Sequence, residues 1–196
     1  MFVIAVILVL LLSVGYFYAA SSAMESATVT VAVCGYLSEE QRLALSQMFA
    51  RYAPDTDAEY DPDTGLLKVE LVVYELPAEA GSSAGERARL TGELVGAIES
   101  GRANLLLLDV DTFQQIGNEH LFEDLSTRYE GTAMHGLLYP VSQKTLLARE
   151  ELAGLQPLYL ALCNSEVTGL HENSDKMRKY SYQRDWLNSI VAAEQN

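Results

Sequence analysis

The stretch ANLLLLD, residues 103–109, decides which fold the sequence predicts. It places four consecutive leucines between Asn104 and Asp109, with no alternation of apolar and polar side chains. A strand with one face in water alternates, whereas a strand covered on both faces is apolar throughout. We therefore expect a central strand in a sheet that has helices on both sides, which is the arrangement of α/β proteins.

The rest of the chain alternates predicted strands with predicted helices. Residues 38–41 and 83–86 match the capping box S-x-x-E/Q and therefore begin the first two helices, and a last helix is expected over about 177–193. Strands are expected at 27–33, 67–74, 103–108, 135–141 and 158–163. This order predicts a single three-layer α/β domain with a mostly parallel sheet of about five strands.

Residues 2–20 form an apolar run without a charged side chain. At 1.5 Å per residue the run spans roughly 28 Å, close to the ~30 Å hydrocarbon core of a bilayer. We therefore expect one N-terminal transmembrane helix in an anchor of residues 1–23. A cleavable signal peptide is the alternative, because small residues at 20–23 suit a peptidase. Residues 24–196 are then expected to form an extracytoplasmic α/β domain.

The composition argues against several classes of protein. The chain has 27 Asp and Glu against 13 Lys and Arg, a net charge of −14, which argues against binding to nucleic acid. Two cysteines, Cys34 and Cys163, are too few for a disulfide scaffold or a four-thiolate zinc site. Whether they bond to each other stays open, and two separate buried thiols are favoured.

A basic cluster near the end of the chain stands out against this acidic background. It comprises Lys176, Arg178, Lys179 and Arg184, with two tyrosines between them. Such a cluster suits a protein partner or an anionic lipid surface. A solvated helix face explains the same residues, and we favour that explanation.

Residues 81–85, GSSAG, match the nucleophile motif of α/β hydrolases. His135 or His171 could then assist Ser83, together with Asp109 or Asp124. The motif requires a strand that ends directly at a strained turn, and here several residues follow the predicted strand before Gly81. We favour Ser83 as a helix cap, so that no catalytic residue is expected.

Acidic residues recur at alternate positions from Asp55 to Asp63, and Glu70 follows. Carboxylate oxygens on one loop are ligands for calcium. Thr64 stands where a calcium loop of this register needs glycine, so a solvated acidic turn is favoured. We expect no metal and no cofactor.

The layout resembles one lobe of the type II extracellular solute-binding (periplasmic-binding-like) fold. The resemblance rests on the segment 34–38 after the first strand, the strand at 104–109, the segment 121–126 and the strand at 139–141. The chain returns to the next strand about ten residues after Leu125, so no second lobe fits. The resemblance implies a ligand edge at the carboxyl ends of the strands. The expected ligand-binding residues are Gly35, Tyr36, Leu37, Ser38, Asp109, Asp111, Pro140 and Ser142.

These observations predict a membrane-anchored binding or assembly domain outside the cytoplasm, and not an enzyme. Its expected contacts are the membrane through residues 2–20 and a protein partner. A sensor or carrier of a small solute, namely a sugar, amino acid or peptide, is the alternative. A serine hydrolase that uses Ser83 is the remote one.

Overall fold

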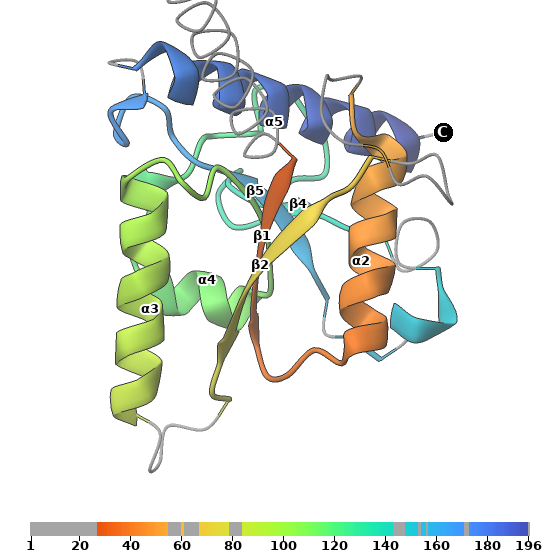
Figure 1. Cartoon of the computed structure of the whole chain (residues 1–196). Helices are drawn as coiled ribbons and strands as arrows, with labels where there is room; N and C mark the ends of the chain where they lie inside the picture. The colour runs from red at the N-terminus through yellow and green to blue at the C-terminus, as the bar shows by residue number, and fades with distance from the viewer. Residues whose placement is uncertain are drawn as a thin grey trace, which may run out of the picture.

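The computed structural model describes residues 27–54, 60, 67–78, 84–142, 148–152, 154–155, 157–170 and 173–195. Figure 1 shows their arrangement, with helices on both sides of one sheet. The elements are β1 (Thr28–Cys34), α2 (Glu39–Tyr52), β2 (Glu70–Leu76), α3 (Ala84–Glu99), β3 (Leu105–Leu108), α4 (Val110–Ile116), η1 (Glu119–Leu121), β4 (Tyr139–Pro140), η2 (Glu150–Leu152), β5 (Tyr159–Leu162) and α5 (Ser174–Glu194).

The sheet has the strand order β2-β1-β3-β5-β4. β1 runs parallel to both of its neighbours, β2 and β3, whereas β5 runs antiparallel to both β3 and β4. The sheet is therefore mixed, and the expectation of a mostly parallel sheet was wrong. The reason lies in the link from β4 to β5. A parallel β5 would need a long crossover from β4, usually a helix, that returns the chain to the other end of the sheet. The described residues of the link contain only the three-residue η2.

The four leucines of β3 occupy the centre of the sheet. Leu105, Leu106, Leu107 and Leu108 are all fully buried, as expected of a strand covered on both faces. In Figure 1, α2 lies on one side of the sheet and α3 and α4 lie on the other, while α5 crosses the end at which β1 begins. Burying each such leucine contributes roughly 1.5–3 kcal/mol, so β3 is the centre of the core.

The start of α2 follows the capping box predicted at 38–41. The N–H of Gln41 donates to the Ser38 hydroxyl at 3.2 Å, and the N–H of Ser38 donates to the Gln41 side chain at 2.9 Å. The second predicted box includes Ser83, which lies outside the described residues.

The strand expected at 135–141 is shorter in the structure. Met134 and His135 have φ values of 48° and 58°, in the left-handed region, so the chain turns there. Only Tyr139 and Pro140 form β4.

The transmembrane helix expected at residues 2–20 lies outside the described residues. Within the described part of the chain, each helix is too short or too polar to cross a membrane.

Candidate functional site

Four of the predicted ligand-binding residues meet at the carboxyl end of β1. Gly35, Tyr36, Leu37 and Asp109 line a cavity of about 200 Å³, which we call the strand-end pocket. Its other lining residues are Val33, Cys34, Gln41, Gly154, Leu155 and Leu158. Chain segments far apart in sequence thus meet here, as the predicted ligand edge requires.

The carboxylate of Asp109 is already occupied by the protein itself. One oxygen accepts a hydrogen bond from the N–H of Cys34 and the other from the N–H of Thr112, each at 2.7 Å. Asp109 is buried, and through these bonds it caps α4 and joins α4 to the end of β1. At 4% exposure, Asp109 offers a ligand in the pocket little accessible surface.

The thiol of Cys34 also lines the strand-end pocket. It accepts a hydrogen bond from the Gln115 side chain at 3.0 Å. Burial raises the pKa of this thiol above its usual value, so the reactive thiolate is scarce at neutral pH. Cys34 and Cys163 are separate free thiols, as we favoured from the sequence, but Cys163 alone is fully buried and Cys34 is half-buried.

The other four predicted residues lie outside the lining of the strand-end pocket. Ser38 caps α2, and Asp111 is exposed in the first turn of α4. Pro140 is exposed in β4, and the N–H of Ser142 donates to Glu194 at 3.0 Å. Whether these residues bind a ligand stays a prediction.

The possible hydrolase and calcium motifs fall largely outside the described residues. Ser83, His171 and the acidic positions from Asp55 to Asp63 all lie there. The other candidate histidine, His135, is exposed and faces Glu119 at 3.6 Å. In the described part of the chain, no three His, Cys, Asp or Glu side chains are grouped to hold a metal ion.

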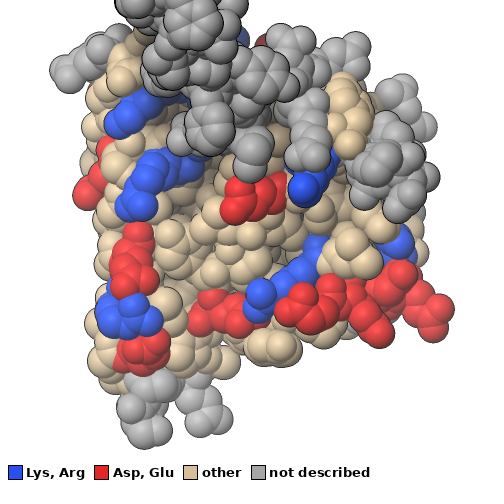
Figure 2. Space-filling model, viewed as in Figure 1, with Lys and Arg blue, Asp and Glu red and all other residues tan. Residues whose placement is uncertain are grey.

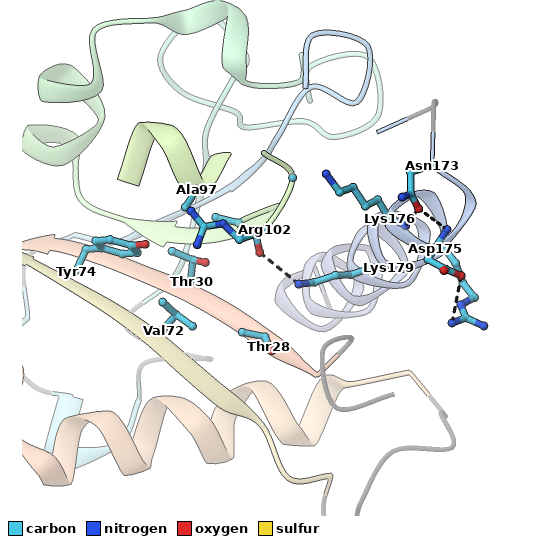
Figure 3. A pocket seen from close by; sticks show the side chains of 13 residues that line it. Thr28, Thr30, Val72, Tyr74, Ala97, Arg102, Asn173, Asp175, Lys176 and Lys179 are labelled. Atoms are coloured by element: carbon cyan, nitrogen blue, oxygen red, sulfur yellow. Dashed lines mark hydrogen bonds and ion pairs between the residues drawn. The ribbon is translucent and has the colours of Figure 1, made fainter. Parts of the chain in front are cut away.

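A larger cavity lies at the opposite end of β1. Its volume is about 490 Å³, and we call it the basic pocket because four lysines and arginines line it. Its walls are the faces of β1 and β2, the end of α3 with the loop that follows, and the first turns of α5 (Figure 3). The lining residues are Thr28, Thr30, Val72, Tyr74, Ala97, Gly101, Arg102, Ala103, Asn173, Asp175, Lys176, Arg178 and Lys179.

The basic side chains of this pocket are held by oxygens at the end of α3. Lys176 donates to the carbonyl of Ser100 at 2.8 Å, and Arg102 donates through Nε to the Ser100 hydroxyl at 3.1 Å. Lys179 donates to the carbonyl of Arg102 at 3.3 Å. Asn173 caps α5 by accepting from the N–H groups of residues 175 and 176. The lysines thus also attach α5 to the end of α3, where cations are favourable.

This concentration of positive charge contrasts with the rest of the visible surface. In Figure 2, Lys and Arg side chains gather at the upper left, where the start of α5 meets the end of α3, while acidic side chains prevail along the lower edge. Arg178 also contacts Asp175, at 3.8 Å.

The sheet forms the uncharged half of the basic pocket. Thr30, Val72 and Tyr74 point to the same face, because Thr30 pairs with Val72 in the parallel register and Tyr74 follows two residues later. Thr30 is 3% exposed, and its hydroxyl makes no hydrogen bond with any residue that the structure describes. In Figure 3 its side chain and that of Tyr74 extend toward the head group of Arg102.

Sequence reasoning found part of this site and missed the rest. Lys176, Arg178 and Lys179 belong to the basic cluster noted in the sequence, whereas the fourth member, Arg184, does not line the pocket. Arg102 and Thr30 were missed. The one sequence signal for Arg102 is its place just after a predicted helix, where a cation is favourable. Nothing in the alternation of β1 distinguishes Thr30.

Comparison of the chain with protein-family models, curated proteins and solved structures finds no match. The resemblance to a solute-binding lobe therefore stays a sequence-based expectation. The structure defines this chain as a single α/β domain with a mixed sheet and a basic pocket.

Proposed function

We propose that this chain is a binding domain that holds a small anionic ligand in the basic pocket. The observation that carries the proposal is the convergence of Lys176 and Arg102 on Ser100 from two different elements. Their partners there are neutral oxygens, and neither side chain forms an ion pair with a carboxylate among the described residues. Two neighbouring cations repel each other, so an anion between them is favourable.

The size of the basic pocket supports the same function. Pockets for small ligands usually measure about 300–1,000 Å³, and this pocket lies within that range. The strand-end pocket has less than half the volume, and its carboxylate is occupied by backbone N–H groups. Of the two, the basic pocket is the better candidate for the ligand site.

Binding of a protein partner stays a prediction from the sequence. Tyr36 and Leu43 are 73% and 60% exposed, which makes them the most exposed large apolar side chains in the described part of the chain. They are the first residues to replace in a search for a partner surface.

Isothermal titration of the full-length chain with inorganic phosphate tests the proposal. We expect saturable binding that weakens as the salt concentration rises. Lys176→Gln and Arg102→Gln should each weaken it roughly tenfold or more, because each removes a charge-assisted hydrogen bond. Arg184→Gln is the matched control, since it removes a cation from α5 outside the pocket.

Three outcomes would contradict the proposal. The first is no saturable binding of phosphate, sulfate or citrate. The second is equal weakening by Arg184→Gln, which would indicate a general charge effect. The third is binding to phosphatidylserine vesicles without binding to soluble anions, which would indicate a lipid surface instead.

A further inference from the structure

We infer that the ligand of the basic pocket is a phosphorylated sugar. Its phosphate group lies between Arg102 and Lys176, and its uncharged, hydroxyl-bearing ring lies on the face of β1 and β2. This inference rests on the proposed function and adds the chemical class of the ligand.

The first argument is the space that an inorganic anion would leave. One water molecule takes about 30 Å³, so a tetrahedral oxyanion of five heavy atoms fills only a fraction of the 490 Å³ available. The pocket also extends over the sheet, where Thr30, Val72 and Tyr74 line it (Figure 3). A ligand that fills the pocket therefore has a body as well as an anionic group.

The second argument is the chemistry of the sheet face. Thr30 is 3% exposed and lines the basic pocket, and its hydroxyl makes no hydrogen bond with a described residue. A ligand hydroxyl in the pocket would pair with it. Val72 is 37% exposed beside it and offers an apolar surface. A sugar ring has hydroxyl groups around an apolar face, so it could pair with the Thr30 hydroxyl and pack against Val72.

The third argument is the charge of the anionic group. Arg102 and Lys176 supply two positive charges whose described partners are neutral oxygens. A phosphate monoester carries about −1.5 to −2 at neutral pH, which matches two cations better than a single carboxylate does. The Nη groups of Arg102 make no hydrogen bond with described residues, so they remain available to phosphate oxygens, for which a guanidinium is well shaped.

Attachment of α5 to the end of α3 is the competing explanation for these cations. It accounts for Lys176 and Lys179, whose amines bind carbonyls there. It does not account for the Thr30 hydroxyl or for the Nη groups of Arg102. The experiment must therefore measure affinity separately from stability.

The test compares three probes on the full-length chain: inorganic phosphate, glucose 6-phosphate and glucose. We expect glucose 6-phosphate to bind at least tenfold more tightly than inorganic phosphate, and glucose to bind more weakly than either. Thr30→Val should reduce the ratio of the two phosphate affinities by about tenfold, because it removes the hydroxyl that contacts the ring. Thr91→Val is the matched control: it makes the same substitution on α3, outside this pocket, at a hydroxyl that has no partner among the described residues.

The outcomes separate this inference from the proposed function. Equal affinities for inorganic phosphate and glucose 6-phosphate, with Lys176→Gln still reducing both, would overturn the sugar phosphate and leave an anion site. An affinity ratio unchanged in Thr30→Val would also overturn the inference. No binding of any anion would overturn the proposed function itself. Thermal unfolding of each variant without ligand shows whether a loss of affinity reflects a loss of folding.

Discussion

The carboxylate of Asp109 accepts a hydrogen bond from the backbone N–H of Cys34, at 2.7 Å and across 75 positions of sequence. Its other oxygen accepts from the N–H of Thr112 in the first turn of α4. One buried side chain thus accepts hydrogen bonds from a backbone N–H at the end of β1 and from another in the first turn of α4. Asp109 was predicted as a ligand-binding residue, and these contacts give it a structural role.

Asp109→Ala should therefore lower the free energy of unfolding by about 2–3 kcal/mol, because the variant loses a helix cap and leaves buried N–H groups without partners. Asp111→Ala is the matched control, since Asp111 is exposed in the same helix turn and should cost less than about 1 kcal/mol. Urea unfolding followed by circular dichroism measures both. Equal losses would contradict the role assigned to Asp109.

Gly101 and Gly92 should respond in opposite directions to replacement by alanine. Gly101 has a φ of +69°, and a Cβ there would lie 2.1 Å from Cδ2 of the buried Leu170. Gly101→Ala should cost about 2–3 kcal/mol, from the backbone conformation and the displaced leucine. Gly92 lies within α3, and its Cβ would meet nothing within 4 Å. Gly92→Ala should therefore stabilise the protein by roughly 0.5–1 kcal/mol.

Thermal unfolding of the two glycine variants checks the sign of each change. The same sign for both would contradict the prediction. Because the loop after Gly101 carries Arg102, Gly101→Ala should also weaken phosphate binding. Gly92→Ala should leave that binding as it is.

Trp186 joins α5 to α2. Its indole N–H donates to the carbonyl of Phe49 at 3.0 Å, and the two rings meet edge to face with centroids 5.9 Å apart. Trp186→Phe should lower the free energy of unfolding by about 2–3 kcal/mol, because it removes the hydrogen bond and leaves a cavity. Tyr36→Phe, at an exposed position, should change it by less than about 0.5 kcal/mol. A similar effect of both would contradict the prediction.

Cys163 should make the protein less stable in alkaline solution. Burial raises the pKa of its thiol from 9.0 to about 12 in the folded protein. Above pH 9 the unfolded chain loses this proton first, so the free energy of unfolding falls as the pH rises from 9 toward 12. The steepest slope from one such group is about 1.4 kcal/mol per pH unit.

Comparison of the wild-type protein with Cys163→Ala isolates this contribution. The variant should lose less stability than the wild type between pH 9 and pH 11, measured by urea unfolding. Burial also raises the pKa of Tyr180, which acts in the same direction, but Tyr180 is present in both proteins. Parallel pH profiles for the two proteins would contradict the prediction.

The sequence predicted those parts of the fold that depend on neighbouring residues. The capping box at Ser38 needs only residues 38–41, and it forms as expected. The four leucines of β3 are fully buried because a run without polar side chains cannot have a face in water. These features, with the alternation of strands and helices, determine the α/β class.

The direction of β5 and the composition of the basic pocket depend on the tertiary structure alone. β5 runs antiparallel because of how the chain between β4 and β5 turns back, and local patterns do not encode that path. The pocket brings together Thr30, Arg102 and Lys176 from a strand, a loop and a helix that lie far apart in sequence. By itself, the sequence determined which segments are buried and where α2 begins. Only the packing of α5 against the end of α3 decided which charges would share a site.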